Sequence, residues 1–466
     1  MKNPNPALVG AVPGVYIAGE AAGALFQVFV SDWLGRKRFM MVLCVIVTVG
    51  SALQTGAPNF AAFLVGRVIA GFAVGGLIAC VVLFNTASSE ISPPHARGLV
   101  TGISGIGISL GTMVSNWIGL GGAYAPYGQI QWRLPLGLQI PWGIFLFLAL
   151  LFVLPESPRW LYRHGHEEEA RKAFISIHGG SFGSDREAEA EFILMTKVIE
   201  AERSQEVDSV REIFARYPKR TIISMASQTM TSLTGVNVIQ YYQTILYKAL
   251  GMTGNNILLL AGVYGTVALI ANVLTTWFIC DRFGRRPMLL LGLLSVVIVD
   301  AYNAIMTDVF ATSSNNVAKG FAILGIYLFV TCYYGLLNST TWLYAPEIVP
   351  LPIRSKVTAL GAFTHFVVNV GLTEAGPSAF QNIGANYYWV FVGSSAFFLV
   401  FGWFYFKETK DLTLEQIAKQ FGDDLVPVTE EDIRKLETEE NKGDASSAGG
   451  SAEKQQAEIE HVENGV

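Results

Sequence analysis

The sequence predicts an all-α membrane protein made of two related halves. Of its 466 residues, 51% are hydrophobic and only 15% are Asp, Glu, Lys or Arg, which is too little charge to cover a soluble chain of this length. Apolar runs of roughly 18–25 residues recur, the length that crosses a hydrocarbon layer of about 30 Å as a helix. The charged sequence DWLGRKR at residues 32–38 returns as DRFGRR at residues 281–286. This repetition indicates a duplicated unit.

Eleven apolar segments are long enough to cross a membrane as helices. In chain order they lie near residues 8–30, 39–56, 61–86, 98–121, 134–154, 221–250, 256–279, 287–307, 318–344, 356–375 and 387–406. Buried core helices of a soluble protein are the alternative, but this many long apolar runs would leave no amphipathic helices to cover them. The motif PESPRWL at 155–161 separates the first five spans from the last six. We therefore predict two pseudo-symmetric helical bundles, of five and six membrane-spanning helices.

Two hydrophilic segments complete the organisation of the chain. The first mixes acidic and basic residues in a helix-like pattern, so we expect short solvated helices between the bundles. The second is acidic, rich in Gly and Ser near 443–452, and poor in large apolar residues, a composition typical of disorder. The predicted units are an N-terminal bundle at 1–161, a cytoplasmic helical linker at 162–218, a C-terminal bundle at 219–418 and a disordered acidic cytoplasmic tail at 419–466.

Lys and Arg are concentrated in the loops on one side of the predicted helices. Arg36, Arg97, Arg285 and Arg354 lie in those loops, whereas the opposite loops carry few basic residues. The more basic side of a membrane protein usually faces the cytoplasm. We therefore expect a multi-pass protein of the plasma membrane with a cytoplasmic C-terminus and an external N-terminus.

Further motifs follow one another in a fixed order. They are Gly66-Arg67, Trp132-Arg133, Pro155–Leu161, Gly235–Asn237 with Tyr241-Tyr242, Trp342–Glu347 and Glu408–Glu415. Together with the two Asp-x-x-Gly-Arg loops, this set resembles the sugar porters of the major facilitator superfamily, and fungal members most of all. The resemblance implies two bundles that rock about a central sugar site. The predicted spans correspond to family helices 2–6 and 7–12, so we expect that the counterpart of the first family helix is lacking.

This resemblance implies a secondary transporter that moves a monosaccharide or small oligosaccharide by alternating access, either passively or with proton symport. A transporter-like sugar sensor and a non-functional truncated fragment are the alternatives. A polyol or another polyhydroxylated solute is the alternative substrate. The chain has no phosphate loop, nucleophile elbow or clustered metal ligands, so enzymatic activity has no support.

Residues 221–250 carry the polar side chains that a sugar site requires. Sugars are uncharged and rich in hydroxyl groups, so they need amides, hydroxyls and an aromatic face. Gln228, Thr231, Ser232 and Gly235 share one helix face through their i, i+3, i+4 and i+7 spacing. Polar contact between helices is the alternative explanation. The resemblance adds further substrate-binding candidates, which are Asn237, Tyr241, Tyr242, Trp342, His365 and Asn369.

The chain departs from the family pattern at this site. Thr231 and Ser232 stand where many members have two glutamines, and Gly105 stands where they have a glutamine on the fifth helix. Shorter side chains predict a larger pocket with fewer amide contacts, which favours a disaccharide or another polyhydroxylated solute over glucose. For His365, a histidine that is hydrogen-bonded within the helix packing remains an equal alternative.

Charged residues near the basic loops are expected to close the cytoplasmic side through ion pairs, as the resemblance implies. Partly exposed bridges worth about 1 kcal/mol or less each suit a reversible latch. Anchoring of the topology alone is the alternative for the basic members. The candidates are Asp32, Arg36, Glu90, Arg97, Glu156 and Arg159 in the first half and Asp281, Arg285, Glu347 and Arg354 in the second.

Three ionisable residues, Glu20, Arg67 and Asp300, fall inside predicted spans. Such residues are costly in a membrane and usually functional, so we consider them for proton coupling, with a satisfied buried acid as the alternative for either carboxyl. None of the four cysteines has metal-ligand spacing. The expected partners are a sugar, protons and the lipid bilayer, with no cofactor, metal or nucleic acid.

Overall fold

The computed structural model describes residues 5–91, 97–126, 128–178, 189, 192–193, 195–197, 199–200, 209–278, 280–310, 315–410, 412 and 414–422. Within these ranges every regular element is a helix, as the sequence predicted. The chain divides into a unit at Met1–Phe421 and a second one at Gly422–Val466. The predicted tail beyond residue 422 lies outside the described residues, so the helical unit alone is considered below.

The first half starts with four long helices. They are α1 (Pro6–Leu34), α2 (Arg36–Gly56), α3 (Phe60–Ile91) and α4 (Arg97–Ala123). The span predicted near 134–154 is instead two helices, α5 (Ile130–Gly137) and α6 (Ile140–Phe152). Pro141 stands in the first turn of α6 and has no N–H to continue the hydrogen bonds of α5. Three short helices follow, α7 (Pro158–Arg163), α8 (Glu167–His178) and α10 (Val210–Arg216).

The second half contains the remaining six predicted spans. Its elements are α11 (Pro218–Leu233), α12 (Val236–Ala249), α13 (Asn256–Phe278), α14 (Cys280–Phe283), α15 (Arg285–Phe310), α16 (Asn316–Cys332), the π-helical turn η1 (Tyr333–Asn338), α17 (Ser339–Glu347), α18 (Leu351–Asn382), the 3-10 turn η2 (Gly384–Asn386), α19 (Tyr387–Tyr405) and α20 (Leu414–Phe421). The span predicted at 221–250 is therefore broken between α11 and α12, and the one at 318–344 contains a π-helical turn.

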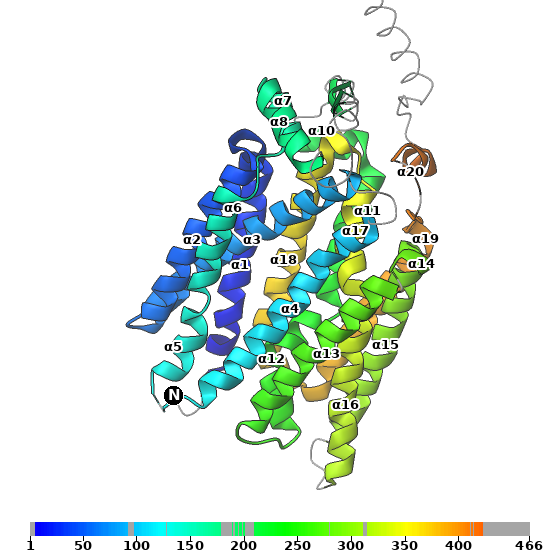
Figure 1. Cartoon of the computed structure of the whole chain (residues 1–466). Coiled ribbons are helices and arrows are strands. Elements are labelled where there is room, and N and C mark those ends of the chain that lie inside the picture. The colour runs from blue at the N-terminus through cyan, green and yellow to red at the C-terminus, as the bar shows by residue number, and fades with distance from the viewer. Residues whose placement is uncertain are drawn as a thin grey trace, which may run out of the picture. The chain divides into compact units, whose positions relative to one another are not determined.

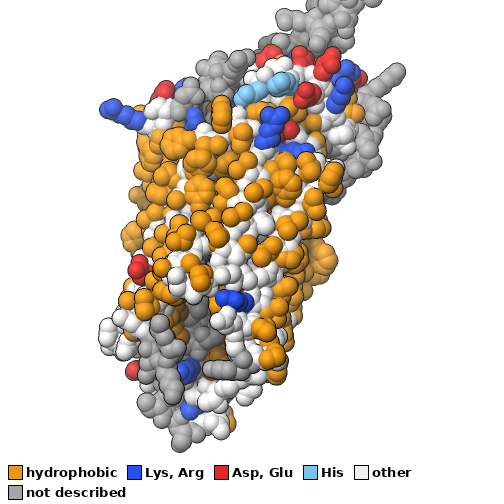
Figure 2. All heavy atoms as spheres, turned by 90° about the vertical axis from the view of Figure 1, so that its left-hand side faces the viewer, with side chains coloured by type: hydrophobic (Ala, Val, Ile, Leu, Met, Phe, Trp, Pro, Cys, Tyr) orange, Lys and Arg blue, Asp and Glu red, His pale blue; other side chains and the backbone are white. Residues whose placement is uncertain are grey.

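All eleven predicted spans are helical in the structure. Nine stretches of helix among the described residues are long and apolar enough to cross a membrane on those criteria alone. The two others are α11–α12, which is interrupted, and α18, which carries polar residues such as His365 and Asn369 along its length. Figure 2 shows a broad band of hydrophobic side chains on one face, with most of the charged side chains gathered at one end. Large apolar side chains such as Phe29, Phe145 and Phe397 are exposed on the surface of the protein, as expected for helices that contact lipid.

Close helix packing in the first half depends on glycine. Gly19 and Gly23 of α1 face Gly71 and Gly75 of α3, a small-xxx-small pattern on both helices. A Cβ at Gly23 would lie 1.9 Å from the carbonyl oxygen of Phe72, and a Cβ at Gly75 would lie 2.0 Å from that of Glu20. The backbones of α1 and α3 can approach this closely only because these positions lack side chains.

The two halves meet mainly along two helix pairs, α1 with α18 and α4 with α13. In the second pair, the backbone of Met113 on α4 lies 2.6 Å from where a Cβ of Gly265 on α13 would be. Figure 1 shows α7, α8, α10 and α20 at one end of the helices. We call this the basic end, since Arg36, Arg285 and Arg354 stand at the starts of α2, α15 and α18 there. The functional candidates lie between this end and the opposite end of the helices.

Candidate functional site

A left-handed glycine separates α11 from α12 and fixes the polar face of α11. Gly235 has φ of +81°, and a Cβ there would lie 2.6 Å from the ring of Phe391. Both the backbone angle and the close ring therefore require glycine. The α11 side chains of Gln228, Thr231 and Ser232 are at most 2% exposed, so the predicted stripe faces protein rather than lipid.

His365 on α18 joins that stripe. Its Nδ1 lies 2.7 Å from Thr231 Oγ1, 2.9 Å from Ser232 Oγ and 3.1 Å from the carbonyl oxygen of Gln228. The Thr231 hydroxyl donates to the Gln228 carbonyl at 2.7 Å, and the Ser232 hydroxyl donates to the His365 carbonyl at 2.9 Å. Because both hydroxyl protons serve carbonyl oxygens, Nδ1 is surrounded by acceptors, which favours the tautomer with its hydrogen on Nδ1. The Nε2 atom of that neutral ring is a hydrogen-bond acceptor.

An aromatic ring and two amides lie close to this histidine. Trp342 on α17 packs edge-to-face with His365, with ring centroids 5.9 Å apart. The amide oxygen and nitrogen of Gln228 are buried and make no hydrogen bond to any described residue. Asn369, one turn along α18, is 2% exposed and accepts a hydrogen bond from Thr373 at 3.0 Å. The structure thus brings Gln228, Thr231, Ser232, His365 and Trp342 together, with Asn369 on the same helix as His365.

The three predicted substrate-binding residues on α12 differ from one another in burial and in contacts. Tyr242 is 3% exposed and donates to the Thr373 carbonyl at 2.7 Å, so it ties α12 to α18. Tyr241 is 41% exposed and lies within electrostatic reach of Glu20 and Arg67 in the first half. Asn237 is half-buried in the first turn of α12. These positions lie beyond the cluster around His365.

The space left by glycine at position 105 is taken by the second half. A Cβ there would lie 2.1 Å from Ser339 Oγ, and the Gly105 carbonyl accepts a hydrogen bond from Asn338 at 3.2 Å. Asn272 on α13 donates to the Tyr334 carbonyl at 2.8 Å and to Ser339 at 3.1 Å. Glycine at this position therefore allows contact between the halves instead of enlarging a pocket. The polar run that starts at Asn338 within an apolar span was the sequence signal for this contact.

A second polar contact between the halves was not foreseen from the sequence. Gln240 on α12 donates to Thr112 on α4 at 3.4 Å and accepts from the Tyr334 hydroxyl at 3.2 Å. Gln243, one turn further along α12, donates to Asn116 on α4 at 3.4 Å. Pairs of this kind lack a local sequence signal, because their members lie more than a hundred residues apart in the chain.

The ionisable residues inside the spans occupy two separate places. Arg67 on α3 lies 4.3 Å from the ring centroid of Tyr16 and donates to the Val12 carbonyl at 3.2 Å. Glu20 on α1 is 6% exposed and lies within electrostatic reach of Arg67. Asp300 lies in the other half, on α15, and is fully buried. Glu20 and Arg67 are therefore neighbours, whereas Asp300 is not part of their cluster.

At the basic end, two glutamates cap helices in equivalent ways. Glu156 Oε1 accepts hydrogen bonds from the N–H groups of Lys37 and Ser157 at 3.0 and 3.1 Å. Glu408 accepts hydrogen bonds from four backbone N–H groups, those of Arg285, Arg286, Thr409 and Lys410, at 2.9–3.1 Å. A carboxylate at a helix N-terminus also complements the helix dipole.

This capping explains the glycine of the repeated motif. Gly35 and Gly284 have φ of +89° and +83°. A Cβ at these positions would lie 2.9 and 2.7 Å from an oxygen of Glu156 and Glu408 respectively. The motif and the glutamate that follows each bundle thus form one local structure, which occurs once in each half.

The predicted ion pairs between the halves are not tested by the described side chains. Arg285 Nη2 lies 3.5 Å from Glu347 within the second half, and Glu347 also accepts a hydrogen bond from Thr409 at 2.7 Å. Arg354 donates to the Val349 carbonyl at 3.2 Å, and Arg36 and Arg159 are half-buried. The side chains of Asp32, Glu90, Arg97 and Asp281 lie outside the described part, so the closing of the basic end by ion pairs remains a prediction.

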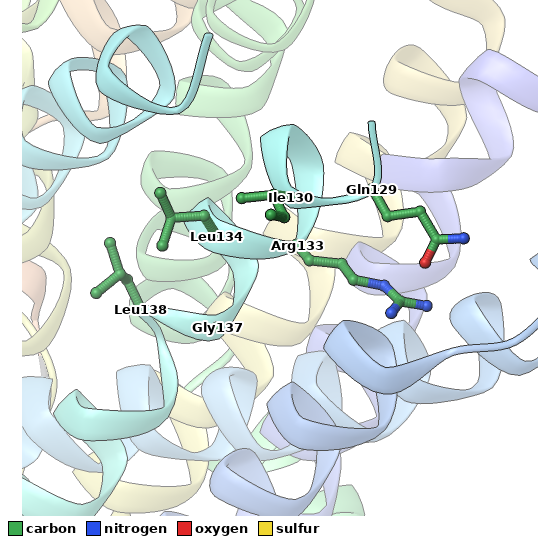
Figure 3. A pocket seen from close by; sticks show the side chains of 6 residues that line it. All are labelled: Gln129, Ile130, Arg133, Leu134, Gly137 and Leu138. Carbon is green, nitrogen blue, oxygen red and sulfur yellow. The ribbon is translucent and has the colours of Figure 1, made fainter. Parts of the chain in front are cut away.

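A pocket of about 490 Å³ lies on α5, apart from these clusters. Figure 3 shows Leu134 and Leu138 on one side of it, with the side chains of Gln129 and Arg133 extending to the other side. Arg133 donates to the Ala57 carbonyl at 3.2 Å, so it ties α5 to the end of α2. Apart from Gln129 and Arg133 the lining is apolar, and it has no hydroxyl group or aromatic ring to bind a sugar.

The family model of the sugar (and other) transporters matches residues 2–421. The chain belongs to this family. This sugar transporter family member is 32% identical to the MFS-type transporter criB of Aspergillus cristatus, over 90% of this chain and 86% of that protein. It is 29% identical to the high-affinity glucose transporter of Kluyveromyces lactis, over 91% of this chain and 79% of that protein.

The fold is also that of solved transporters. The proton:xylose symporter XylE, bound to 6-bromo-6-deoxy-D-glucose, superposes with a TM-score of 0.75 at 21% identity and covers 89% of each chain. The inward-open xylose transporter XylE from E. coli gives a TM-score of 0.68 at 21% identity, over 90% of this chain and 91% of that one. The major facilitator fold predicted from the motifs is thereby confirmed, and the family consists of transporters rather than enzymes, as expected.

Proposed function

We propose that this sugar transporter family member moves a sugar or another polyhydroxylated solute across a membrane by alternating access. The observation that carries the proposal is the cluster on α11, α17 and α18, where the backbone of Gln228 contacts His365, His365 packs against Trp342, and the side-chain amide of Gln228 is buried without a hydrogen bond to a described residue. An amide, an imidazole acceptor and an indole face are the groups that bind hydroxyl-rich, uncharged rings. The transporters named above, one of glucose and one of xylose, support this substrate class.

Binding would use fewer side-chain amides than the family pattern has. Thr231 and Ser232 direct their hydroxyls at His365 and at carbonyl oxygens, so they position the histidine rather than the solute. Gln228, His365, Trp342 and Asn369 are then the groups that contact substrate. Asn237, Tyr241 and Tyr242 lie further along α12 and would form the gate at the end opposite the basic end.

Proton coupling, if the transport is a symport, is assigned to Glu20 and Arg67. Glu20 of the first half lies within electrostatic reach of Arg67 and of Tyr241 in the second half. A carboxyl between the two halves that faces an arginine can change its charge as the halves separate. We further propose that the protein lies in the plasma membrane. Its basic end and its C-terminus would face the cytoplasm, in agreement with the positive-inside rule.

Uptake of a panel of labelled sugars and polyols by a transporter-null host tests the proposal. Gln228→Ala should raise KM about tenfold, since loss of two hydrogen bonds to substrate costs about 1–2 kcal/mol. Trp342→Ala should abolish uptake, whereas Trp403→Ala, which removes an exposed indole on α19, should leave it unchanged. Failure of the unmodified chain to move any of these solutes would refute the transport proposal. Binding of a sugar without flux in proteoliposomes would favour the sensor alternative.

Coupling is tested separately with Glu20→Gln. This variant should lose uncoupler-sensitive accumulation while it keeps exchange of sugar across the membrane. Asp308→Asn changes an exposed aspartate on α15 and is the control. Uncoupler-insensitive uptake by the unmodified chain would show that transport is passive and would exclude the role of Glu20.

A further inference from the structure

One acid inside the second half, Asp300, has no hydrogen-bond or ion-pair partner among the described residues. Asp300 on α15 is 0% exposed, and neither of its carboxyl oxygens makes a hydrogen bond to any residue that the structure describes. In that same part of the chain no Lys, Arg or His forms a salt bridge with it. An isolated carboxylate in such apolar surroundings costs several kcal/mol. The group is therefore stable here as a neutral acid that carries a proton.

Two unused hydrogen-bond donors lie beside this acid. Asn303 follows one turn later on the same face of α15, is 1% exposed, and has neither its amide nitrogen nor its oxygen hydrogen-bonded. Its Oδ1 faces Gly325 of α16, where a Cβ would lie 2.1 Å away. Tyr388 on α19 is also 1% exposed with an unbonded hydroxyl, and it lies within electrostatic reach of Asp300. An amide and a phenol can stabilise the carboxylate once its proton has left.

A row of three buried phenols interacts electrostatically between Asp300 and the contact between the halves, although the hydroxyls of Tyr388 and Tyr264 make no hydrogen bond to a described residue. Tyr388 lies within electrostatic reach of Tyr264 on α13, and Tyr264 lies within reach of Tyr334 in the π-helical turn η1. All three rings are at most 2% exposed. The Tyr334 hydroxyl donates to Gln240, which in turn donates to Thr112 of the first half. The row thus ends where the two halves touch, and it includes a π-helical turn, a distortion that is frequent at functional sites.

The groups that face this cluster are almost all tyrosines. The groups that interact electrostatically along this row are the tyrosines Tyr247, Tyr264, Tyr327, Tyr333, Tyr334 and Tyr388. Other described titratable side chains of α15, α16 and α19 include Tyr302, Asp308, Lys319, Cys332, Tyr387 and Tyr405. Phenols stay neutral at physiological pH, so Asp300 is the member of the cluster that changes charge. The proton that this region gains or loses is therefore bound at one carboxyl, that of Asp300.

We propose that Asp300 is a proton-binding site inside the second half, with the Asn303 amide and the Tyr388 hydroxyl placed to stabilise its carboxylate. On release, the O–H bond of the Asp300 carboxyl breaks, its electron pair stays on the carboxylate oxygen, and the proton leaves to water. The carboxylate left behind accepts hydrogen bonds from the Asn303 amide and the Tyr388 hydroxyl. This inference rests on the proposed symport for its role in transport, but proton binding itself does not depend on any solute.

Infrared spectroscopy of the full chain in lipid vesicles tests proton binding without transport. The unmodified chain should show the C=O stretch of a protonated carboxylic acid at neutral pH, and the band should be lost on alkaline titration. Because Glu20 is also a buried carboxyl, the comparison is made in the Glu20→Gln background, where Asp300→Asn should remove this band and Asp300→Glu should keep it. Asp308→Asn makes the same change at an exposed aspartate of the same helix and should leave the band intact. An unaltered band in Asp300→Asn would overturn the proposal.

Transport of labelled D-glucose in the same vesicles tests coupling. Asp300→Asn should lose accumulation driven by a pH gradient but keep counterflow exchange, and Tyr388→Phe should slow accumulation without abolishing it. Accumulation by Asp300→Asn equal to that of the unmodified chain would refute the coupling role. If the unmodified chain moves no glucose, the proposed function fails with that sugar while the infrared result still decides whether Asp300 binds a proton. Asp300→Glu retains the carboxyl and keeps both tests decisive if the asparagine variant does not fold.

Discussion

The two helix-capping glutamates should respond differently to the same substitution. Glu408 uses both carboxyl oxygens: Oε1 accepts from the N–H groups of Arg285, Thr409 and Lys410, and Oε2 accepts from that of Arg286. Glu156 uses Oε1 alone, and its Oε2 is buried without a hydrogen bond to a described residue. Glutamine keeps the shape of both side chains but has a single acceptor oxygen.

The structure gives the expected magnitudes. In Glu156→Gln the amide oxygen can take the place of Oε1 and keep both hydrogen bonds, so the loss is that of the charge at a helix N-terminus, about 0.3–1 kcal/mol. In Glu408→Gln one oxygen can keep three hydrogen bonds, but the –NH₂ group then faces the N–H of Arg286. Loss of that charge-assisted bond and of the charge together should cost about 2–4 kcal/mol. Glu408→Gln should therefore be clearly the more destabilising substitution.

Thermal unfolding of the two variants in the same detergent measures this difference. The unfolding temperature should fall for Glu408→Gln and change little for Glu156→Gln. Salt should reduce the small effect in Glu156→Gln, because the interaction of a half-buried charge with a helix end is partly screened. Salt should change the effect of the lost hydrogen bond in Glu408→Gln less. Equal destabilisation of the two variants, or a larger effect in Glu156→Gln, would refute the assignment of the carboxyl oxygens to their N–H partners.

Three further substitutions test the packing of the helices. Gly75→Ala places a Cβ 2.0 Å from the Glu20 carbonyl and should reduce the folded, monodisperse fraction in size-exclusion chromatography, whereas Gly111→Ala, with nothing within 4 Å, should not. Gly235→Ala places a Cβ 2.6 Å from the Phe391 ring at a backbone φ of +81°. It should lower the free energy of unfolding by about 2–4 kcal/mol. The unfolding temperature should therefore be lower than that of the control Gly393→Ala. Tyr242→Phe removes the hydrogen bond to Thr373 and should cost about 1 kcal/mol; an unchanged unfolding temperature would contradict this.

Local sequence patterns predicted the spans well and their interruptions poorly. A run of apolar residues predicts a membrane-spanning helix wherever it occurs, so all eleven positions were found. The breaks at Gln139 and Gly235 and the π-helical turn at Tyr333 depend on what packs against the helix at that point, such as the Phe391 ring against Gly235. Their glycine and proline signals were visible, but the choice between a kink, a break and a continuous helix was not.

The candidate site shows the same division. The spacing of Gln228, Thr231 and Ser232 on one helix face was readable, because the helical period alone sets it. The role of His365 was left open between substrate contact and helix packing, and the structure shows that its Nδ1 is held by Thr231 and Ser232. Two of these side chains serve to position a third, which a list of polar residues does not reveal.

The sequence by itself determined that this chain is a duplicated membrane protein of the sugar transporter family. Length of apolar runs, repeated loop motifs and their order are properties of the chain, and they hold for any arrangement of the helices. Only the tertiary structure decided that Ser339 takes the space at Gly105, that Glu20 lies within electrostatic reach of Arg67, and that Asp300 has no hydrogen-bond partner among the described residues. Each of these facts depends on atoms contributed by helices far apart in the chain, and burial among them sets whether a polar group is paired or isolated.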